Sequence, residues 1–161
     1  MGAILNKEMI YLGADHAGFE LKEKIKEDLI KKGQKVADLG AHTLDKNDDY
    51  PDYAKAVSDK VTGDSSAKGI LFCGSAEGIC IAANKVKGIR AVAVWSTTNA
   101  KMSREHNDAN VLCLSGGQTL EPIPATSFEE AREIVDTWLA TPFSGAERHQ
   151  RRIQKIHELE K

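Results

Sequence analysis

The sequence predicts an α/β fold: a doubly wound, Rossmann-like five-stranded parallel sheet with helices on both faces and a further helix at the C-terminus. Three observations predict it. Five short apolar runs have the length of buried strands, segments with helical spacing alternate with them, and turn residues separate the two kinds of segment. Strands and helices that alternate at this spacing form βαβ units and therefore a parallel sheet. Right-handed crossovers then place helices on both faces.

The first half of the chain begins with a short apolar strand, Met9–Gly13, which a glycine ends. An amphipathic helix follows, because three apolar residues recur every fourth position before a closing glycine: Leu21, Ile25 and Leu29. The second strand is expected at Val36–Leu39, and a polar loop comes after it. Pro51–Val61 is expected to be a helix, since proline is favoured in a first helical turn.

The second half continues the alternation. Ile70–Cys73 is an apolar run that suits a fully buried strand, and Ile79–Ala83 suits a helix. A strand at Ile89–Trp95, a helix at Thr97–His106 and a strand at Asn110–Leu114 follow. Two further helices are expected beyond a Gly- and Pro-containing loop: one opens with the capping box Ser127–Glu130 and runs to Leu139, and the last carries Ile153, Ile156 and Leu159.

Composition narrows the class of protein. A chain of 161 residues is most simply one domain, residues 1–161, in which residues 1–8 are a short N-terminal extension. The formal charge of −2 and the pI near 6.2 give no reason to expect a nucleic-acid partner, and residues 1–13 match neither a signal peptide nor a membrane span. The three cysteines lie in or beside apolar runs without zinc spacing, which favours reduced thiols, a cytoplasmic location and no metal.

The most informative segment is the expected turn from Cys73 to Gly78 between a strand and a helix. Such a turn aims free backbone N–H groups at its surroundings, and the helix that follows adds a partial positive charge, so anions bind there. A thiol beside an anion site favours chemistry on a phosphorylated or enolising substrate. A buried cysteine at a strand end would give the same pattern, and the spacing does not separate the two interpretations.

Two further pairs of polar residues follow predicted elements. Asp15 and His16 come directly after the first strand, where a carboxylate and an imidazole can act on one ligand. Alternatively, Asp15 caps the first helix and His16 forms a local hydrogen bond. His106 and Asn107 end another helix, where the histidine is either an acid–base group or a partner of the helix dipole.

The last helix places Arg148 and Arg152 four residues apart, so that they share one face. An anion bound between them would offset their repulsion, whereas a solvated face that also holds Glu147 would need none. The segment Tyr50–Tyr53 either lines a site or only begins a helix, and the sequence does not decide between these roles.

Five segments, in this order, resemble the ribose/galactose sugar-phosphate isomerase family, which includes ribose-5-phosphate isomerase B and the galactose-6-phosphate isomerase subunits. The resemblance extends from about Met9 to Ile156. The segments that carry it are Gly13–Phe19, Asp49–Tyr53, Cys73–Lys85, Ser103–Asp108 and Arg148–Arg152.

The resemblance implies roles for the turn. Cys73 would be the base that moves a proton between C2 and C1 of the sugar through a cis-enediolate, and Ser75 would assist. Family members that use glutamate as the base carry it just after the last glycine of the turn, where this chain has Ile79. Backbone groups of the turn would hold the developing oxyanion and so bind the substrate; the residues are Gly74, Ala76, Glu77 and Gly78.

The resemblance also implies roles for the other polar pairs. His106 would open the sugar ring with Asp15 as its partner, and Asn107 would contact the sugar. The phosphate would be held by His16, Arg148 and Arg152. No metal or organic cofactor is implied. The family builds its site across a subunit interface, so we expect a homodimer or a dimer of dimers in which some of these groups come from the partner subunit.

The implied reaction is the interconversion of ribose 5-phosphate and ribulose 5-phosphate. One departure bears on the substrate: the family usually has a phosphate-binding arginine shortly after the fifth strand, where this chain has Gly117 or Gln118. That difference keeps a six-carbon substrate such as allose 6-phosphate or galactose 6-phosphate as an alternative. A non-catalytic sensor of a sugar phosphate is a further alternative, although a sensor needs no proton-transfer groups.

Overall fold

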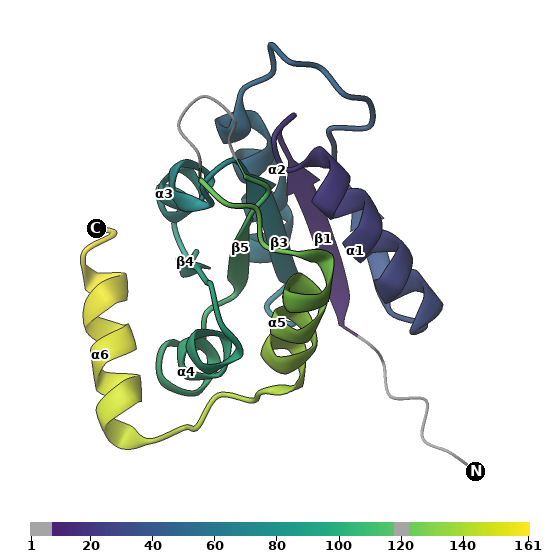
Figure 1. Ribbon diagram of the computed structural model, residues 1–161. Helices are drawn as coiled ribbons and strands as arrows, with labels where there is room; N and C mark the ends of the chain where they lie inside the picture. Colours follow the sequence, from purple (N-terminus) through teal and green to yellow (C-terminus); the bar gives the residue numbers. More distant parts are fainter. Residues whose placement is uncertain (1–7, 118–122) are drawn as a thin grey trace.

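The computed structural model describes residues 8–117 and 123–161, and within these ranges it has the predicted alternation of strands and helices (Figure 1). The expected N-terminal extension lies, apart from residue 8, outside the described residues. The elements in chain order are β1 (Met9–Ala14), α1 (Phe19–Lys31), β2 (Lys35–Asp38), α2 (Tyr50–Gly63), β3 (Lys68–Cys73), α3 (Glu77–Asn84), β4 (Ala91–Ala93), α4 (Thr97–Asn107), β5 (Val111–Ser115), α5 (Phe128–Ala140) and α6 (Glu147–Glu158).

The five strands form one sheet in the order β2-β1-β3-β5-β4, and all pairs are parallel. One face is covered by α1, α4 and α5, whose apolar residues form a core cluster with alternate strand residues. The other face is covered by α2 and α3, which form the second cluster. The predicted fold class, a doubly wound parallel sheet with an additional C-terminal helix, is therefore confirmed.

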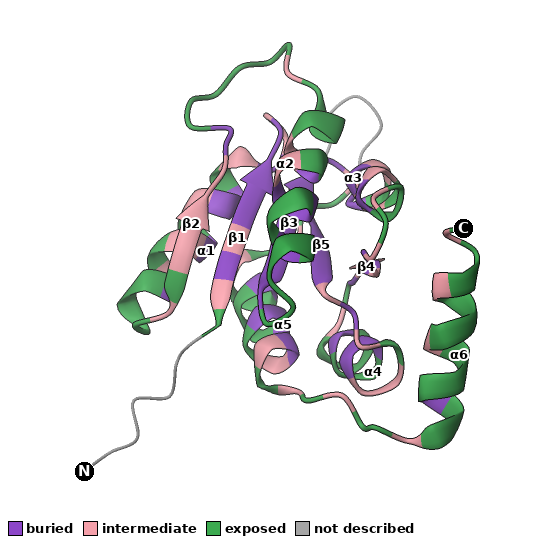
Figure 2. Ribbon diagram, turned by 180° about the vertical axis from the view of Figure 1, so that it is seen from behind, coloured by how far each residue is buried: buried purple, intermediate pink, exposed green. Residues whose placement is uncertain are grey.

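Strand β3 lies at the centre of the sheet and is buried along its whole length (Figure 2). Because successive side chains of a strand point to opposite faces, Ile70 and Phe72 pack into the cluster beneath α1 and α5. Leu71 and Cys73 pack into the cluster beneath α2 and α3. The thiol of Cys73 thus stands at the carboxyl end of the central strand, on the face that α3 covers.

The sheet has its topological switch between β1 and β3. From β1 the chain crosses to β2 on one side, and after β2 it returns to β3 on the other side of β1. Loops that leave neighbouring strands in opposite directions open a crevice beyond the strand ends, and ligands bind there in folds of this kind. Gly18 allows α1 to begin close to β3, since a Cβ there would lie 2.4 Å from the carbonyl carbon and oxygen of Phe72.

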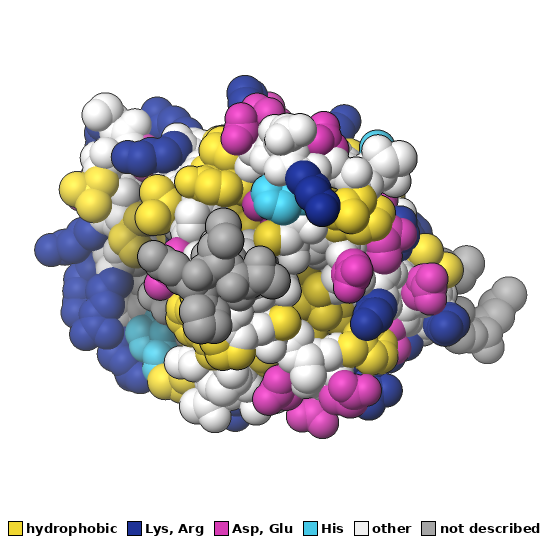
Figure 3. All heavy atoms as spheres, turned by 45° about the horizontal axis from the view of Figure 1, so that its top comes forward, with side chains coloured by type: hydrophobic (Ala, Val, Ile, Leu, Met, Phe, Trp, Pro, Cys, Tyr) yellow, Lys and Arg dark blue, Asp and Glu magenta, His cyan; other side chains and the backbone are white. Residues whose placement is uncertain are grey.

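Helix α6 stands apart from the sheet and contacts helix α4 (Figures 1 and 2). Of its residues, His149 is buried, and Arg148 and Arg152 are exposed. Lys and Arg side chains gather on the side of the molecule where this helix lies (Figure 3). Among the helices of the described ranges, none combines the length and the apolar character that a membrane span requires.

Candidate functional site

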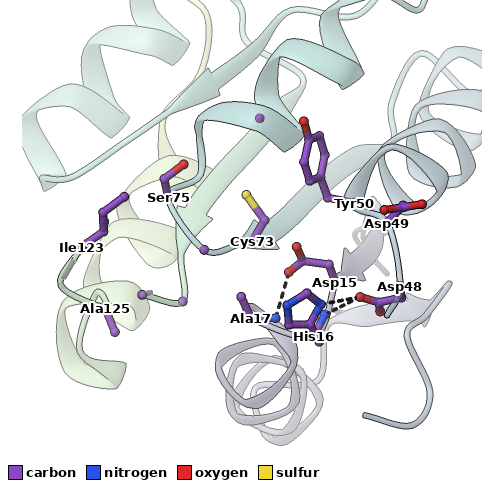
Figure 4. Close-up of a pocket in the computed structure, with 14 residues that line it drawn as sticks. Asp15, His16, Ala17, Asp48, Asp49, Tyr50, Cys73, Ser75, Ile123 and Ala125 are labelled. Atoms are coloured by element: carbon purple, nitrogen blue, oxygen red, sulfur yellow. Dashed lines mark hydrogen bonds and ion pairs between the residues drawn. The ribbon is translucent and has the colours of Figure 1, made fainter. Parts of the chain in front are cut away.

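A cavity of about 950 Å³ opens at the carboxyl ends of β1, β3 and β5 (Figure 4). Viewed from this end, the surface mixes apolar, acidic and histidine side chains (Figure 3). The lining residues come from the loops after these three strands and from the segment that leads into α2: Asp15, His16, Ala17, Asp48, Asp49, Tyr50, Cys73, Gly74, Ser75, Gly78, Gly116, Gly117, Ile123 and Ala125. The cavity lies at the switch point, as the topology predicts.

Cys73 lies at the end of β3 with 3% of its surface exposed. Burial raises the pKa of its thiol, and the negative charge of Asp15 raises it further. Backbone N–H groups of Ser75, Ala76 and Ile79, at the start of α3, act in the opposite direction. The net effect is a raised pKa, so the thiol holds its proton in the free protein at neutral pH.

Asp15 is 5% exposed, and its Oδ1 accepts hydrogen bonds from the backbone N–H groups of Ala17 (3.0 Å) and Gly18 (3.1 Å). These bonds stay within the turn before α1: the helix has Gly18 as its N-cap and no side chain caps it, so the interpretation of Asp15 as a helix cap is wrong. The carboxylate also lines the cavity beside Cys73, as the other interpretation expects. Burial raises the pKa of Asp15, whereas its two backbone hydrogen bonds lower it.

His16 turns the other way along the cavity wall and contacts Asp48 (Figure 4). Its ring Nδ1 lies 2.7 Å from Asp48 Oδ1, and its backbone N–H donates to the same oxygen at 2.9 Å. Asp48 is not among the site residues that the sequence predicts. Within the polar loop before α2 its carboxylate resembles its solvated neighbours, so no local signal distinguishes it.

The turn into α3 contributes only part of its predicted set to the cavity wall. Gly74, Ser75 and Gly78 line the cavity, but Ala76 and Glu77 are not among the lining residues, and the Glu77 side chain is exposed. Ser75 Oγ accepts a hydrogen bond of 3.3 Å from the Glu77 N–H. The turn is tight because Ala76 has a positive φ of 68°, which is uncommon outside glycine.

Tyr50 fulfils both roles that the sequence left open, since it begins α2 and lines the cavity. Its ring lies against Gly78, where an added Cβ would be 2.8 Å from the ring carbon Cζ. The tyrosine therefore forms one wall over the start of α3. Gly117, at one of the two positions of the expected arginine, also lines the cavity, and Gln118 lies outside the described residues.

The remaining predicted residues form a second group, on α4 and α6. The rings of His106 and His149 are 4.3 Å apart between centroids and are tilted by 42°. Ser144 Oγ lies 3.0 Å from His149 Nδ1. Burial lowers the pKa of His149, and the positive charge of Arg148 lowers it further.

None of the predicted residues on α4 and α6 is among the described residues that line the Cys73 cavity; they are His106, Asn107, Arg148 and Arg152. Within one chain, the predicted residues therefore form two groups, one in the Cys73 cavity and one on α4 and α6. In the described part of the chain, no three His, Cys, Asp or Glu side chains are grouped closely enough to hold a metal ion.

The sequence of the chain is similar to those of known sugar-phosphate isomerases. The family model described as ribose/galactose isomerase matches residues 10–156. A probable ribose-5-phosphate isomerase B of Mycoplasma genitalium is 46% identical over 153 residues, which cover 94% of this chain and 95% of that protein. The ribose-5-phosphate isomerase B of Mycobacterium tuberculosis is 42% identical over 152 residues, 94% of this chain and 90% of that protein.

Solved structures agree with the sequence comparisons. The crystal structure of the Mycoplasma genitalium ribose-5-phosphate isomerase B with bound ribulose-5-phosphate has a TM-score of 0.87 and 46% identity, and covers 94% of this chain and 95% of that one. The fold, the order of the motifs and the extent of these matches lead to one conclusion: the chain belongs to the ribose/galactose isomerase family.

Proposed function

We propose that the protein interconverts ribose 5-phosphate and ribulose 5-phosphate, with Cys73 as the catalytic base. The observation that carries the proposal is the position of the thiol, at the end of the central strand, inside the cavity and facing the N-terminus of α3. The relatives named ribose-5-phosphate isomerase B, one of them with bound ribulose-5-phosphate, support this substrate.

In the proposed reaction, Cys73 acts in its thiolate form, which is the minor form in the free protein at neutral pH. The thiolate takes the proton from C2 of the open-chain aldose, and the C1 carbonyl oxygen gains the electron pair. The resulting cis-enediolate keeps its charge on oxygens that face the backbone N–H groups of the turn. A proton passes from O2 to O1, and the Cys73 thiol then returns its proton to C1. The product is the ketose, and no external oxidant or reductant is consumed.

We further propose that His106, Asn107, Arg148 and Arg152 complete the Cys73 cavity of a partner subunit in a homodimer or a dimer of dimers. Three observations support this. The two groups of predicted residues are separate within one chain, and α6 stands away from its own sheet (Figure 1). Large apolar side chains are also exposed on α3, before α4 and on α4, namely Ile81, Trp95 and Met102.

A complementation assay tests this shared site. Cys73→Ala and His106→Asn variants would each be inactive alone, because every site lacks one group. After the two are unfolded together in equal amounts and refolded, half of the dimers are mixed, and one of the two sites in each mixed dimer is intact. About a quarter of the wild-type activity should therefore return. If both groups acted within one chain, no activity would return.

The reaction itself is tested by proton NMR of the protein with ribose 5-phosphate in D₂O. We expect ribulose 5-phosphate to form and deuterium to appear on the carbons between which the proton moves. Cys73→Ala should lower kcat by at least about 10²-fold, the range for a lost general base, while the melting temperature stays near that of the wild type. Cys80→Ala is the matched thiol control and should retain activity.

A six-carbon sugar phosphate is the second candidate substrate, because this chain has Gly117 or Gln118 where the family usually has one phosphate-binding arginine. A comparison of kcat/KM for ribose 5-phosphate, allose 6-phosphate and galactose 6-phosphate decides between them. Tight binding of a sugar phosphate without exchange of its C2 proton would contradict both substrates and favour a sensor.

A further inference from the structure

Asp48 lies in the loop between β2 and α2, 32 residues along the chain from His16, yet its side chain is only 7% exposed. A single oxygen of its carboxylate, Oδ1, contacts His16 twice. It accepts the backbone N–H at 2.9 Å and lies 2.7 Å from the ring Nδ1 (Figure 4). Both the backbone and the ring of His16 are therefore held by the same atom.

This contact determines what the ring can offer to a ligand. An ionised carboxylate only accepts hydrogen bonds, so Nδ1 of His16 carries a proton. Nε2 is then the remaining polar atom of a ring that lines the cavity. It can donate to an anion only in the doubly protonated form of the ring, whose positive charge Asp48 balances.

The surroundings of Asp48 are costly for a carboxylate. Its second oxygen, Oδ2, is buried and has no hydrogen-bond partner among the described residues. Burial raises the pKa of the nearby Tyr53 to about 12, and the approach of its hydroxyl to Asp48 and the negative charge of that carboxylate add to the shift, so Tyr53 is a neutral neighbour that offers Asp48 a hydroxyl but no charge. Within the described ranges, His16 is the ion-pair partner that the structure gives to Asp48. If Asp48 only filled space, a neutral side chain of similar size would stabilise the fold more than a buried carboxylate does.

We propose that Asp48 is a positioning residue, which fixes the imidazole of His16 as a hydrogen-bond donor to the phosphate group of the substrate. The proposal rests on the proposed function and on the role that the family resemblance implies for His16, which is to hold the phosphate. Asp48 does not touch the substrate in this role. It acts through His16, and its removal should therefore weaken binding more than turnover.

Asp48→Asn tests the proposal, since it removes the charge and nearly preserves the shape. We expect KM for ribose 5-phosphate to rise about tenfold and kcat to change less than about threefold, as for the loss of a charge-assisted hydrogen bond. The Kd for inorganic phosphate, measured by titration calorimetry, should rise by a similar factor. Asp45→Asn is the control, because Asp45 lies in the same loop and its side chain caps the N–H of Asn47 instead.

A double-mutant cycle separates positioning from a structural role. If Asp48 acts through His16, then His16→Gln should weaken phosphate binding, and adding Asp48→Asn should weaken it no further. Melting temperatures of all variants check that the fold is retained. The proposal is overturned if the wild type binds no phosphate, if Asp48→Asn binds it as the wild type does, or if the two effects multiply in the double variant.

The phosphate titration needs no turnover, so it also separates this proposal from the proposed function. A protein without isomerase activity that still shows the non-additive cycle would contradict the proposed function and support the role of Asp48. An active isomerase with an additive cycle would do the reverse.

Discussion

Replacing Lys22 by methionine should destabilise the protein by about 3 kcal/mol, because it removes the cation from a buried network. The Lys22 side chain is 0% exposed. Its Nζ donates to both carboxylate oxygens of Asp38, at 2.8 and 2.7 Å, and to the carbonyl of Ala41 at 2.8 Å. It thus joins α1 to β2 and to the start of the loop that carries Asp48.

The magnitude follows from what the substitution leaves behind. Removing one partner of a buried ion pair costs about 3–5 kcal/mol. Asp38 would keep its hydrogen bonds with Lys26, at 2.7 Å, and with the N–H of Gly40, at 3.0 Å, and methionine fills most of the volume of lysine, so we expect the lower end. At about 2–4 °C for each kcal/mol in a chain of this size, the melting temperature should fall by about 6–12 °C.

The network also sets a pH dependence. Burial raises the pKa of Asp38, but the hydrogen bonds from Lys22, Lys26 and Gly40 outweigh it and hold the value at about 2, below the ordinary 3.8. A lowered pKa means that the ionised group stabilises the fold above about pH 4 and that this stabilisation is lost as the pH falls toward 2. The wild type should lose about 2 kcal/mol from this group over that window, and Lys22→Met should lose less.

Urea unfolding at pH 7 and at several values down to pH 2.5, with thermal melts beside it, measures both effects. Lys26→Met is the matched control, since Lys26 also binds Asp38 but is 23% exposed, and it should cost less than about 1 kcal/mol. Lys22→Met with Asp38→Asn should recover part of the loss, because the buried charge is gone. A melting temperature of Lys22→Met equal to that of the wild type would refute the reasoning.

Other substitutions test the turn around Cys73 and the elements behind it. The charge of Asp15 helps to raise the pKa of Cys73, so Asp15→Asn should lower that pKa and speed alkylation of the thiol by iodoacetamide at pH 7, measured by mass spectrometry; an unchanged or slower rate would contradict this. Gly18→Ala places a Cβ 2.4 Å from the carbonyl of Phe72, so α1 must shift and the fold should lose at least about 1–3 kcal/mol, whereas an unchanged urea midpoint would argue against that contact. Ser127→Ala removes the capping box of α5 and should lower the melting temperature by about 2–4 °C, for a loss of about 1 kcal/mol; no change would show that the cap is dispensable.

Most of the fold could be predicted because its signals are local. The apolar run Ile70–Phe72 and the four-residue repeat of the first helix need no knowledge of distant contacts. The lateral order of the strands could not be predicted in this way, because it depends on contacts between distant segments. β5 lies between β3 and β4, and a pairing between segments far apart in the chain leaves no periodic trace in either. The strand expected at Ile89–Trp95 is ordered as a strand only at Ala91–Ala93, where it pairs with β5.

The same distinction between local signals and long-range contacts applies to the site. Asp15, His16 and Cys73 could be predicted because Cys73 ends one strand and the other two follow another, and the carboxyl ends of parallel strands meet at one edge of the sheet. Asp48 could not, since its burial arises from a contact with a residue 32 positions away. The contact between the rings of His106 and His149 likewise joins two helices that no spacing rule connects.

Asp15 and His16 are neighbours in the chain, but their side chains belong to two networks. Asp15 bonds to the backbone of its own turn beside Cys73, whereas His16 bonds to Asp48. Burial raises the pKa of Asp15; beyond that, His16 lowers it and Asp48 raises it, so the charges of the ion pair act on Asp15 in opposite directions. With Asp48 in place, the cavity can hold a positive donor for an anion while the effect of that charge on the neighbouring carboxylate is opposed by the charge of Asp48. Under the proposed function, substitutions at two adjacent positions would therefore act on different properties: those at His16 on affinity for the phosphate, and those at Asp15 on the reactivity of Cys73.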